Sequence, residues 1–259
     1  TKTDLVTQLQ KYNVASVRPE IVDPETTKIL LTSNVKYNAQ VTTKTSTSLK
    51  SDVLTTITNY NTDTLSQFDG VFRYSKLSSL IDATDTSILS NITTLKIRKD
   101  FTPTLGSSTK YNVYFRNALY NPHSGHNSSA GGILESSGFK VSGDTSTVFY
   151  LDDDGQGNVR RYSFSGATRV YANENQGTID YATGAITINS LSVLSVENIR
   201  GSVSTKIELT VKPDSNDVTP VRDQIIEIDT ANSSITVSPD TFVGGSADAG
   251  VGYTTTSSY

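Results

Sequence analysis

The hydrophobic pattern of this chain changes its period near Asp100, and this change constrains the fold more than any other feature. Beyond Asp100, apolar side chains recur at every second position in short runs, as in half-buried β-strands. Turn signals such as Asp154-Gly155 and Thr183-Gly184 separate the runs. Residues 101–243 are therefore predicted to form an antiparallel β-rich region. The alternating sets are Tyr111, Val113 and Phe115; Val148 and Tyr150; Tyr162 and Phe164; Ile179 and Tyr181; Ile186 and Ile188.

Before Asp100 the two periods are mixed. Residues 28–41 and 88–97 read as strands, and apolar side chains recur at helical spacing between them. Neither helix can bury its apolar stripe alone, so residues 28–100 are predicted to form a small two-layer α/β unit, in the order strand, helix, helix, strand. The predicted fold class of the whole chain is α+β. The first strand should bury Ile29, Leu31, Val35, Tyr37 and Ala39, with an irregularity at Ser33-Asn34; the helices should bury Leu49, Val53, Ile57, Tyr60, Phe68, Leu77, Leu80 and Ile81.

The two ends of the chain are predicted to lie outside these regions. Residues 1–27 should form a helix with Leu5, Leu9 and Tyr12 on one side, followed by an extended connector, because proline disfavours helix in the residue before it. Residues 244–259 form a tail rich in Gly, Ser and Thr. The sequence has no methionine, even at position 1, so we interpret it as a fragment of a longer protein or a processed chain.

Composition excludes several classes of partner. Charged residues make up 19% of the 259 residues and the formal net charge is −4, so neither nucleic acid nor an anionic membrane is an expected partner. No apolar run approaches the ~18 residues that a membrane-spanning helix needs. The absence of cysteine excludes disulfides and thiolate chemistry.

The acidic run from Asp152 to Asp154, followed by Gly155, is the sharpest candidate site. Carboxylates on a glycine-bearing turn could bind Ca²⁺, which takes six to eight oxygen ligands. However, an EF-hand count from Asp152 puts Ser163 at position 12, where the bidentate glutamate should stand. We therefore predict a polar hairpin turn without a metal ion.

The other candidates for chemistry are weaker. His123 and His126 could bind Zn²⁺, but no cysteine is present and the closest acid is Glu135, so an exposed loop is the preferred interpretation. No Gly-x-Ser-x-Gly elbow occurs, and Gly131-Gly132 lacks the Lys-Ser/Thr of a phosphate loop. Arg160-Arg161 is too short for a nucleic-acid patch. We predict that the protein is not an enzyme and has no catalytic, cofactor-binding or metal-binding residues.

Several segments, taken in order, carry a resemblance to a known family. The upstream segments are Arg18-Pro19-Glu20-Ile21-Val22-Asp23-Pro24, Phe72-Arg73-Tyr74-Ser75-Lys76-Leu77, Leu80-Ile81-Asp82 and Ile88-Leu89-Ser90-Asn91-Ile92. Two downstream segments, residues 177–186 and 211–222, extend the likeness over most of the chain. In this order the segments are similar to the C-terminal α/β unit of the baseplate J-like proteins, and most of all to the baseplate wedge proteins of T-even-like contractile-tail bacteriophages.

The resemblance implies a structural part of the virion's tail baseplate, assembled in the cytoplasm of the bacterial host. Such a subunit would form the ring around the tail hub, through a two-fold homodimer and contacts with other wedge proteins, and would rearrange when the sheath contracts. The alternative is a carbohydrate- or receptor-binding tail module, because 13 tyrosines could stack on sugars. A glycosidase would need two carboxylates facing each other across a cleft.

Overall fold

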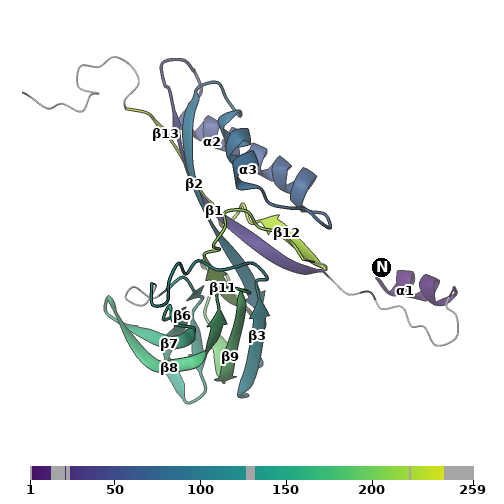
Figure 1. The fold of residues 1–259 in the computed structure, drawn as a ribbon, viewed down its shortest axis with the longest axis vertical. Helices are drawn as coiled ribbons and strands as arrows, with labels where there is room; N and C mark the ends of the chain where they lie inside the picture. Colours follow the sequence, from purple (N-terminus) through teal and green to yellow (C-terminus); the bar gives the residue numbers. More distant parts are fainter. Residues whose placement is uncertain (1, 13–20, 22–23, 127–131, 222, 242–259) are drawn as a thin grey trace, which may run out of the picture.

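The computed structural model describes residues 2–12, 21, 24–126, 132–221 and 223–241. The predicted tail, residues 244–259, lies outside the described residues, as does most of the predicted connector. Within the described part, the chain forms two curled β-sheets that follow one another along the long axis, with helices beside the first sheet (Figure 1).

The first sheet is built around two long antiparallel strands. In the described residues its strands are β1 (Glu25–Tyr37), β2 (Ile88–Phe101), β4 (Glu135–Ser136), β11 (Ile207–Val211), β12 (Gln224–Ile228) and β13 (Ser234–Pro239). Ile29 of β1 lies opposite Ile97 of β2, and Leu31 lies opposite Leu95. β12 and β13 both pair with β1 in parallel, one after the other along the same edge. On the other side, β11 pairs with the last residues of β2, and β4 pairs with β11.

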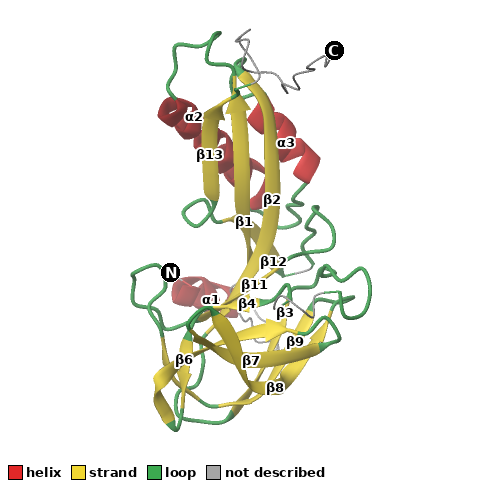
Figure 2. Ribbon diagram, turned by 90° about the vertical axis from the view of Figure 1, so that its left-hand side faces the viewer, coloured by secondary structure: helices red, strands yellow, loops and turns green. Residues whose placement is uncertain are grey.

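Two helices cover one face of this sheet, while the other face is open (Figure 2). They are α2 (Ser46–Tyr60) and α3 (Tyr74–Asp82), and a π-helical turn, η1 (Asn61–Leu65), extends α2. Thr45 caps the start of α2, because its side chain accepts a hydrogen bond from the Ser48 amide at 3.2 Å. The predicted burial is confirmed for Leu49, Val53, Ile57, Tyr60, Leu77 and Ile81, whereas Leu80 is 38% and Phe68 66% exposed.

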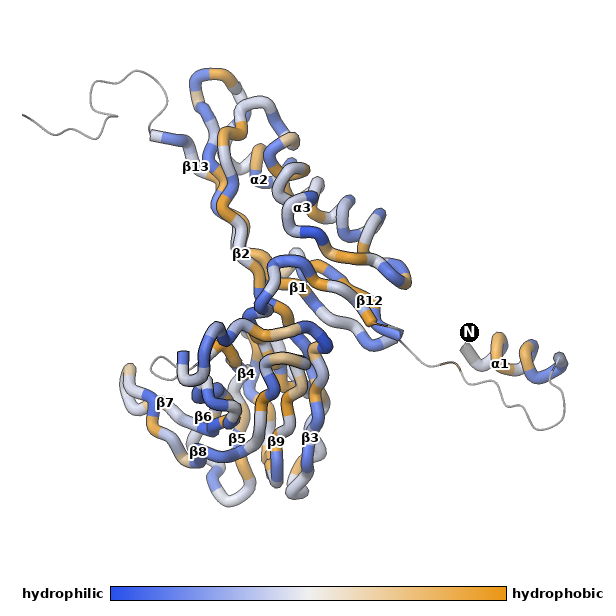
Figure 3. The backbone as a smooth tube through the Cα atoms, viewed as in Figure 1, coloured by the Kyte–Doolittle hydropathy of each residue, from blue (hydrophilic) through white to orange (hydrophobic). Residues whose placement is uncertain are grey.

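β1 alternates more regularly than its sequence indicates. Ser33 is buried in line with Leu31 and Val35, and its hydroxyl lies 2.8 Å from that of Thr93. A hydroxyl paired in this way can stand on the core side, so the expected irregularity at Ser33-Asn34 does not occur. Figure 3 shows short hydrophilic and hydrophobic stretches alternating along the strands. Ala39 lies past the end of β1 and is exposed, so its predicted burial is wrong.

The second sheet is antiparallel throughout. Its described strands are β3 (Thr109–Tyr114), β5 (Phe139–Val141), β6 (Asp144–Asp153), β7 (Asn158–Ser165), β8 (Thr168–Asp180), β9 (Ala185–Leu191) and β10 (Val193–Val196). The strand order is β10-β5-β6-β7-β8-β9-β3. A bridge between Leu105 and Val193 brings the start of the β3 segment to β10, so the sheet curls until its two edges meet at one end.

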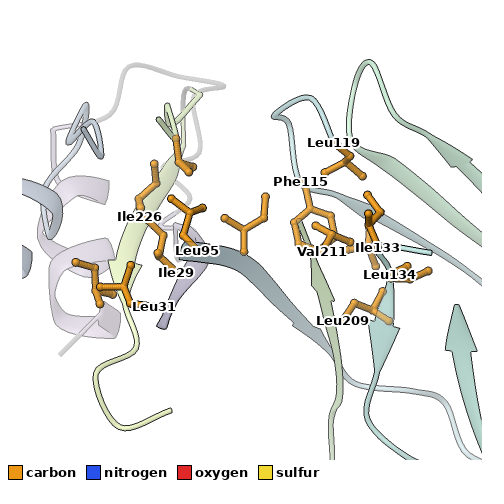
Figure 4. Packing of buried hydrophobic residues seen from close by; sticks show 14 of the residues in the cluster. Ile29, Leu31, Leu95, Phe115, Leu119, Ile133, Leu134, Leu209, Val211 and Ile226 are labelled. Atoms are coloured by element: carbon orange, nitrogen blue, oxygen red, sulfur yellow. The ribbon is translucent and has the colours of Figure 1, made fainter. Parts of the chain in front are cut away.

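The two sheets share one hydrophobic cluster. Ile207, Leu209 and Val211 of β11 are fully buried, although β11 is hydrogen-bonded to the first sheet. Figure 4 places Leu209 and Val211 beside Phe115, the residue after β3 of the second sheet, and Leu134, the residue before β4, with Ile29 further along the same cluster. β11 therefore joins the two layers, because its backbone belongs to one and its side chains to the other.

The predicted fold class, α+β, is wrong. The described residues are mostly β, with 46% strand and 17% helix. The prediction treated the strands after Asp100 as a separate region, but β4, β11, β12 and β13 join the first sheet, and β12 and β13 run parallel to β1. Two helices thus cover one face of a larger sheet, because a local pattern indicates strands but not which distant strands pair with each other.

The predicted N-terminal helix is present as α1 (Lys2–Gln10). Its apolar side chains Leu5 and Leu9 are exposed, at 54% and 41%. None of the helices in the described residues has the length and apolar content to cross a membrane.

Candidate functional site

The acidic run leads from the end of β6 into the hairpin turn before β7. Asp154 stands at the turn itself, and its Oδ1 accepts hydrogen bonds from the amides of Gln156 at 2.8 Å and Asn158 at 2.9 Å. Burial acts to raise the pKa of Asp154, but hydrogen bonds from the Asn158 side chain and these amides outweigh it, so the pKa is lowered. The carboxylate therefore holds the turn, and the predicted polar hairpin turn is present.

Asp152 is the centre of a buried ion-pair cluster on β6, β7 and β8. Its carboxylate lies 3.0 Å from Nε of Arg160 and 2.8 Å from Nη1 of Arg169, and it accepts a hydrogen bond from the Tyr171 hydroxyl at 2.9 Å. Burial is the largest influence on the pKa of Asp152 and raises it, while the charge of Arg160 opposes this effect. Two guanidinium groups and a hydroxyl group thus bind the carboxylate of Asp152, on the face of the sheet that points away from the hydrophobic core.

Asp153 is fully buried, and its carboxylate accepts hydrogen bonds from a different set of donors. Its Oδ1 accepts from the amides of Ile133 at 2.6 Å and Leu134 at 2.8 Å, and its Oδ2 accepts from the Tyr181 hydroxyl at 2.6 Å. Burial, followed by this hydrogen bond, raises the pKa of Tyr181. Successive residues of a strand point to opposite faces, so Asp152 and Asp153 do not converge on one point.

An aromatic cluster surrounds the Asp152 ion pairs. Tyr150 stacks on Tyr162, with ring centres 5.7 Å apart, and the exposed Phe164 meets both rings edge-on at 5.4 Å. Arg169 lies 4.6 Å above the Tyr162 ring, and Arg160 lies 4.3 Å above Tyr171. The arginines therefore cover the faces of two tyrosines. The sequence indicates the alternation of Tyr162 and Phe164, but only strand register brings Tyr150 and Tyr171 beside them.

Tyr150 itself points away from the core. The alternation of Val148 and Tyr150 correctly predicts a strand, but Phe149 and Leu151 are the buried pair and Val148 and Tyr150 lie on the outer face. Both sets are apolar, so the period alone does not reveal which face is buried.

The two histidines contact each other in an exposed loop. Nδ1 of His126 lies 3.0 Å from Nε2 of His123, and the rings are nearly perpendicular. Glu135 is engaged elsewhere, 2.7 Å from Nζ of Lys96. In the described residues, no group of three or more histidine, aspartate or glutamate side chains is placed to hold a metal ion.

A second buried charge cluster, absent from the sequence interpretation, lies on the first sheet, among β2, β11 and the residue after β12. Arg98 of β2 has a side chain 3% exposed, and it lies 3.0 Å from Asp100, 3.0 Å from Asp229 and 3.3 Å from Glu208. The Nε and Nη1 atoms of Arg98 lie within ion-pair distance of Asp100 and Glu208, but among the described residues neither atom has a hydrogen-bond partner of good geometry. Arg200 contacts Glu208 with both terminal nitrogens, at 3.1 and 2.7 Å. An arginine inside a strand pattern is the only sequence signal for this cluster.

A groove of about 420 Å³ opens beside Arg98. Its lining carries both signs of charge, and Glu25 is paired there with Lys99 and lies 3.6 Å from Nε of Arg116. Asp100, the next carboxylate in the lining, is paired with Arg98. These two carboxylates are therefore held in ion pairs, which suits a structural role better than acid–base chemistry.

The family comparison concerns the helix-covered part of the first sheet. Residues 28–100 match the family described as baseplate structural protein gp6, C-terminal domain III. The match includes most of β1, all of α2, η1 and α3, and all of β2 except its last residue, Phe101. It covers less than half of the chain, and no curated protein matches the chain.

The matched family is described as structural, in agreement with the prediction that the chain is not an enzyme. The predicted resemblance to a baseplate protein is confirmed over residues 28–100, whereas the segments 18–24, 177–186 and 211–222 lie outside the match. The match supports a structural role for this chain in the baseplate of a phage tail, and so a place in the virion tail.

Proposed function

We propose that this chain is a structural component of the baseplate wedge of a contractile phage tail. In this proposal it helps to form the ring around the tail hub, and it changes its packing when the sheath contracts. Assembly takes place in the cytoplasm of the bacterial host. The observation that carries the proposal is the family match over residues 28–100, which coincides with the strand–helix–helix–strand unit.

The buried charges support a role that depends on shape and not on chemistry. The carboxylates of Asp152, Asp153 and Asp154 are each engaged by donors from the same chain. Arg98 is likewise surrounded by three carboxylates. Groups paired in this way rigidify a subunit, and they are not available as acids, bases or metal ligands without breaking those contacts. We propose that the chain has no catalytic, cofactor or metal site.

As stretches of sequence, we propose four parts. Residues 1–27 form a helix and a connector, residues 28–100 the α/β unit, residues 101–243 the β-rich region, and residues 244–259 the tail. The last strands of the β-rich region, β11 to β13, return to the sheet of the α/β unit. The partners in this proposal are a second copy of the chain and other wedge proteins, with neither nucleic acid nor membrane.

Labelling of intact tails tests the proposed role. Antibodies raised against the purified chain should mark the baseplate end of tails in negative-stain electron micrographs. The control is the same serum absorbed with the purified chain. A label on the fibres, on the sheath or on no part of the particle would contradict the proposal. Maps of tails before and after contraction test the rearrangement, because the helix-covered sheet should occupy different surroundings in the two states.

The aromatic cluster is the one observation that favours a carbohydrate-binding module. Sugars stack on open ring faces, but Arg169 and Arg160 cover the faces of Tyr162 and Tyr171, which leaves Phe164 as the exposed ring. A glycan array with the wild-type chain and with Phe164→Ala separates the two functions. Binding that is lost in the variant would favour the carbohydrate-binding module, and no binding is expected for a wedge subunit.

A further inference from the structure

Arg161 of β7 differs from the other arginines in the part of the chain that the structure describes. Each of the others lies within 3.6 Å of an aspartate or glutamate oxygen. No carboxylate of the described residues lies at ion-pair distance from Arg161, although its neighbour Arg160 contacts Asp152 at 3.0 Å. The positive charge of Arg161 is therefore uncompensated within the described part of the chain.

The guanidinium group of Arg161 is partly withdrawn from water. The side chain is half-buried and lies 5.1 Å above the ring of Phe149, and its Nε is buried without a hydrogen-bond partner in the described residues. Burial lowers the pKa of Arg161, and no carboxylate opposes this effect. A buried donor without an acceptor costs free energy, and a contact with an aromatic ring offsets only part of that cost. An acceptor from outside the chain would satisfy this group.

The carboxylates at the nearby end of β6 are engaged elsewhere. Asp152 lies on the opposite face of the sheet, where the two arginines described above bind it. Asp153 accepts hydrogen bonds from two backbone amides and from the Tyr181 hydroxyl. Neither carboxylate can pair with Arg161 without breaking these contacts.

Arg161 borders a small apolar surface on its own face of the β7–β8 hairpin. Ser163 shares that face, because alternate residues of a strand point to one side, and it pairs with Phe149 of β6 and Val170 of β8. Val170 is 49% exposed. Figure 1 shows β7 and β8 at the outer margin of the second sheet, where a partner can reach them. Arginine is enriched among the residues that dominate binding at protein interfaces.

We propose that Arg161 binds a carboxylate of a neighbouring wedge protein, and that an apolar side chain beside this carboxylate packs against Val170. The proposal rests on the wedge role proposed above and assigns one of its contact surfaces. Arginine can donate two parallel hydrogen bonds to a carboxylate. A second copy of the chain fits less well, because a two-fold contact uses the same patch on both partners and would bring two uncompensated Arg161 side chains into one interface.

Substitution by methionine separates docking from a structural role. Methionine has a similar length and no charge, so Arg161→Met should keep the melting temperature within about 2 °C of wild type or raise it. Arg160→Met is the matched control, because it removes a partner of the buried Asp152 and should lower the melting temperature by at least about 3 °C. Equal losses for the two variants would show that Arg161 holds the fold, and would refute the proposal.

Binding is measured with peptides from the proposed partners. An array of overlapping peptides covers the other wedge proteins of the same phage, and each bound peptide is titrated by fluorescence anisotropy. We expect the bound peptides to contain aspartate or glutamate next to an apolar residue. Arg161→Met should raise their Kd at least about tenfold, whereas Arg200→Met, which removes an exposed charge elsewhere, should change it less than about threefold.

A double-mutant cycle locates the contact on Arg161. Replacement of the peptide's carboxylate by the matching amide should raise the Kd for the wild-type chain at least about tenfold. The same amide peptide should lose less than about threefold with Arg161→Met, because the two groups act as one pair. Losses that simply multiply would place the carboxylate elsewhere and refute the contact.

Two further results would refute the docking site at Arg161. One is that no wedge peptide binds the wild-type chain, or that Arg161→Met binds every peptide as wild type does. The other is that Arg161→Met changes only self-association in sedimentation, which would make a second copy the occupant. Antibody labelling of tails decides the baseplate role independently, so that role can stand when the docking site fails.

Discussion

Replacement of Arg98 by methionine should destabilise the protein strongly. Arg98 is buried between Asp100, Glu208 and Asp229, and methionine fills a similar space without a charge. Arg200 would still contact Glu208, at 3.1 and 2.7 Å. Removing one partner of a buried ion pair costs about 3–5 kcal/mol, because the remaining charges are left without compensation. We expect a loss of this size in the free energy of unfolding.

The stability lost in Arg98→Met should depend on pH. Burial acts to raise the pKa of Asp229, but the hydrogen bond from Asn232 and the charge of Arg98 outweigh it, so the pKa is lowered in the folded protein. A carboxyl with a lowered pKa stabilises the fold above its unfolded pKa of ~3.9, and this contribution is lost as pH falls through the folded value. The difference between wild type and Arg98→Met should therefore be largest near neutral pH and shrink below about pH 4.

Urea unfolding followed by circular dichroism, at pH 7 and well below pH 4, measures both effects. Arg200→Met is the matched control, because the Arg200 side chain is 47% exposed and an exposed ion pair contributes only about 0–1 kcal/mol. A loss below 1 kcal/mol for Arg98→Met at pH 7, or a loss equal to that of Arg200→Met, would show that the buried cluster does not stabilise the fold.

Three further predictions concern the core, the acidic turn and a glycine. Ile57→Ala should lower the free energy of unfolding by about 2–5 kcal/mol, because Ile57 is buried between α2 and the sheet, and Leu80→Ala by less, because Leu80 is partly exposed; equal losses would contradict the observed helix face. Thermal melts with excess chelator and with excess Ca²⁺ should superimpose, since the carboxylates of the turn between β6 and β7 are already engaged; a large rise with Ca²⁺ would make Asp152 a ligand. Gly132→Ala should lower the free energy of unfolding by more than the ~1–2 kcal/mol expected for an alanine in the left-handed region, because its Cβ would lie 1.8 Å from Oδ1 of Asp153. Gly106→Ala is the control, because Gly106 has φ 72° and open space around it. Equal melting temperatures for the two variants would refute the clash.

The sequence alone determined the elements that depend on neighbouring residues. Helical spacing of Leu49, Val53 and Ile57 identified the buried face of α2, because residues three or four apart share one side of a helix. Alternation of Leu95 and Ile97 identified the buried face of β2. Asp154-Gly155 marked the β6–β7 turn, since an aspartate and a glycine at φ 72° suit a tight reversal. The order of segments in residues 28–100 also indicated the family that the match supports.

Only the tertiary structure decided which strands lie side by side. The parallel pairing of β12 and β13 with β1 joins residues about two hundred positions apart, and this pairing made the protein mostly β. It also decided the chemistry of Asp152, whose acidic run resembles a Ca²⁺ loop until Arg160 and Arg169 are brought beside it. Hydrophobic periodicity reports which face of a strand is buried, but it contains no information about the neighbour across the hydrogen bonds. That choice depends on the packing of the whole chain.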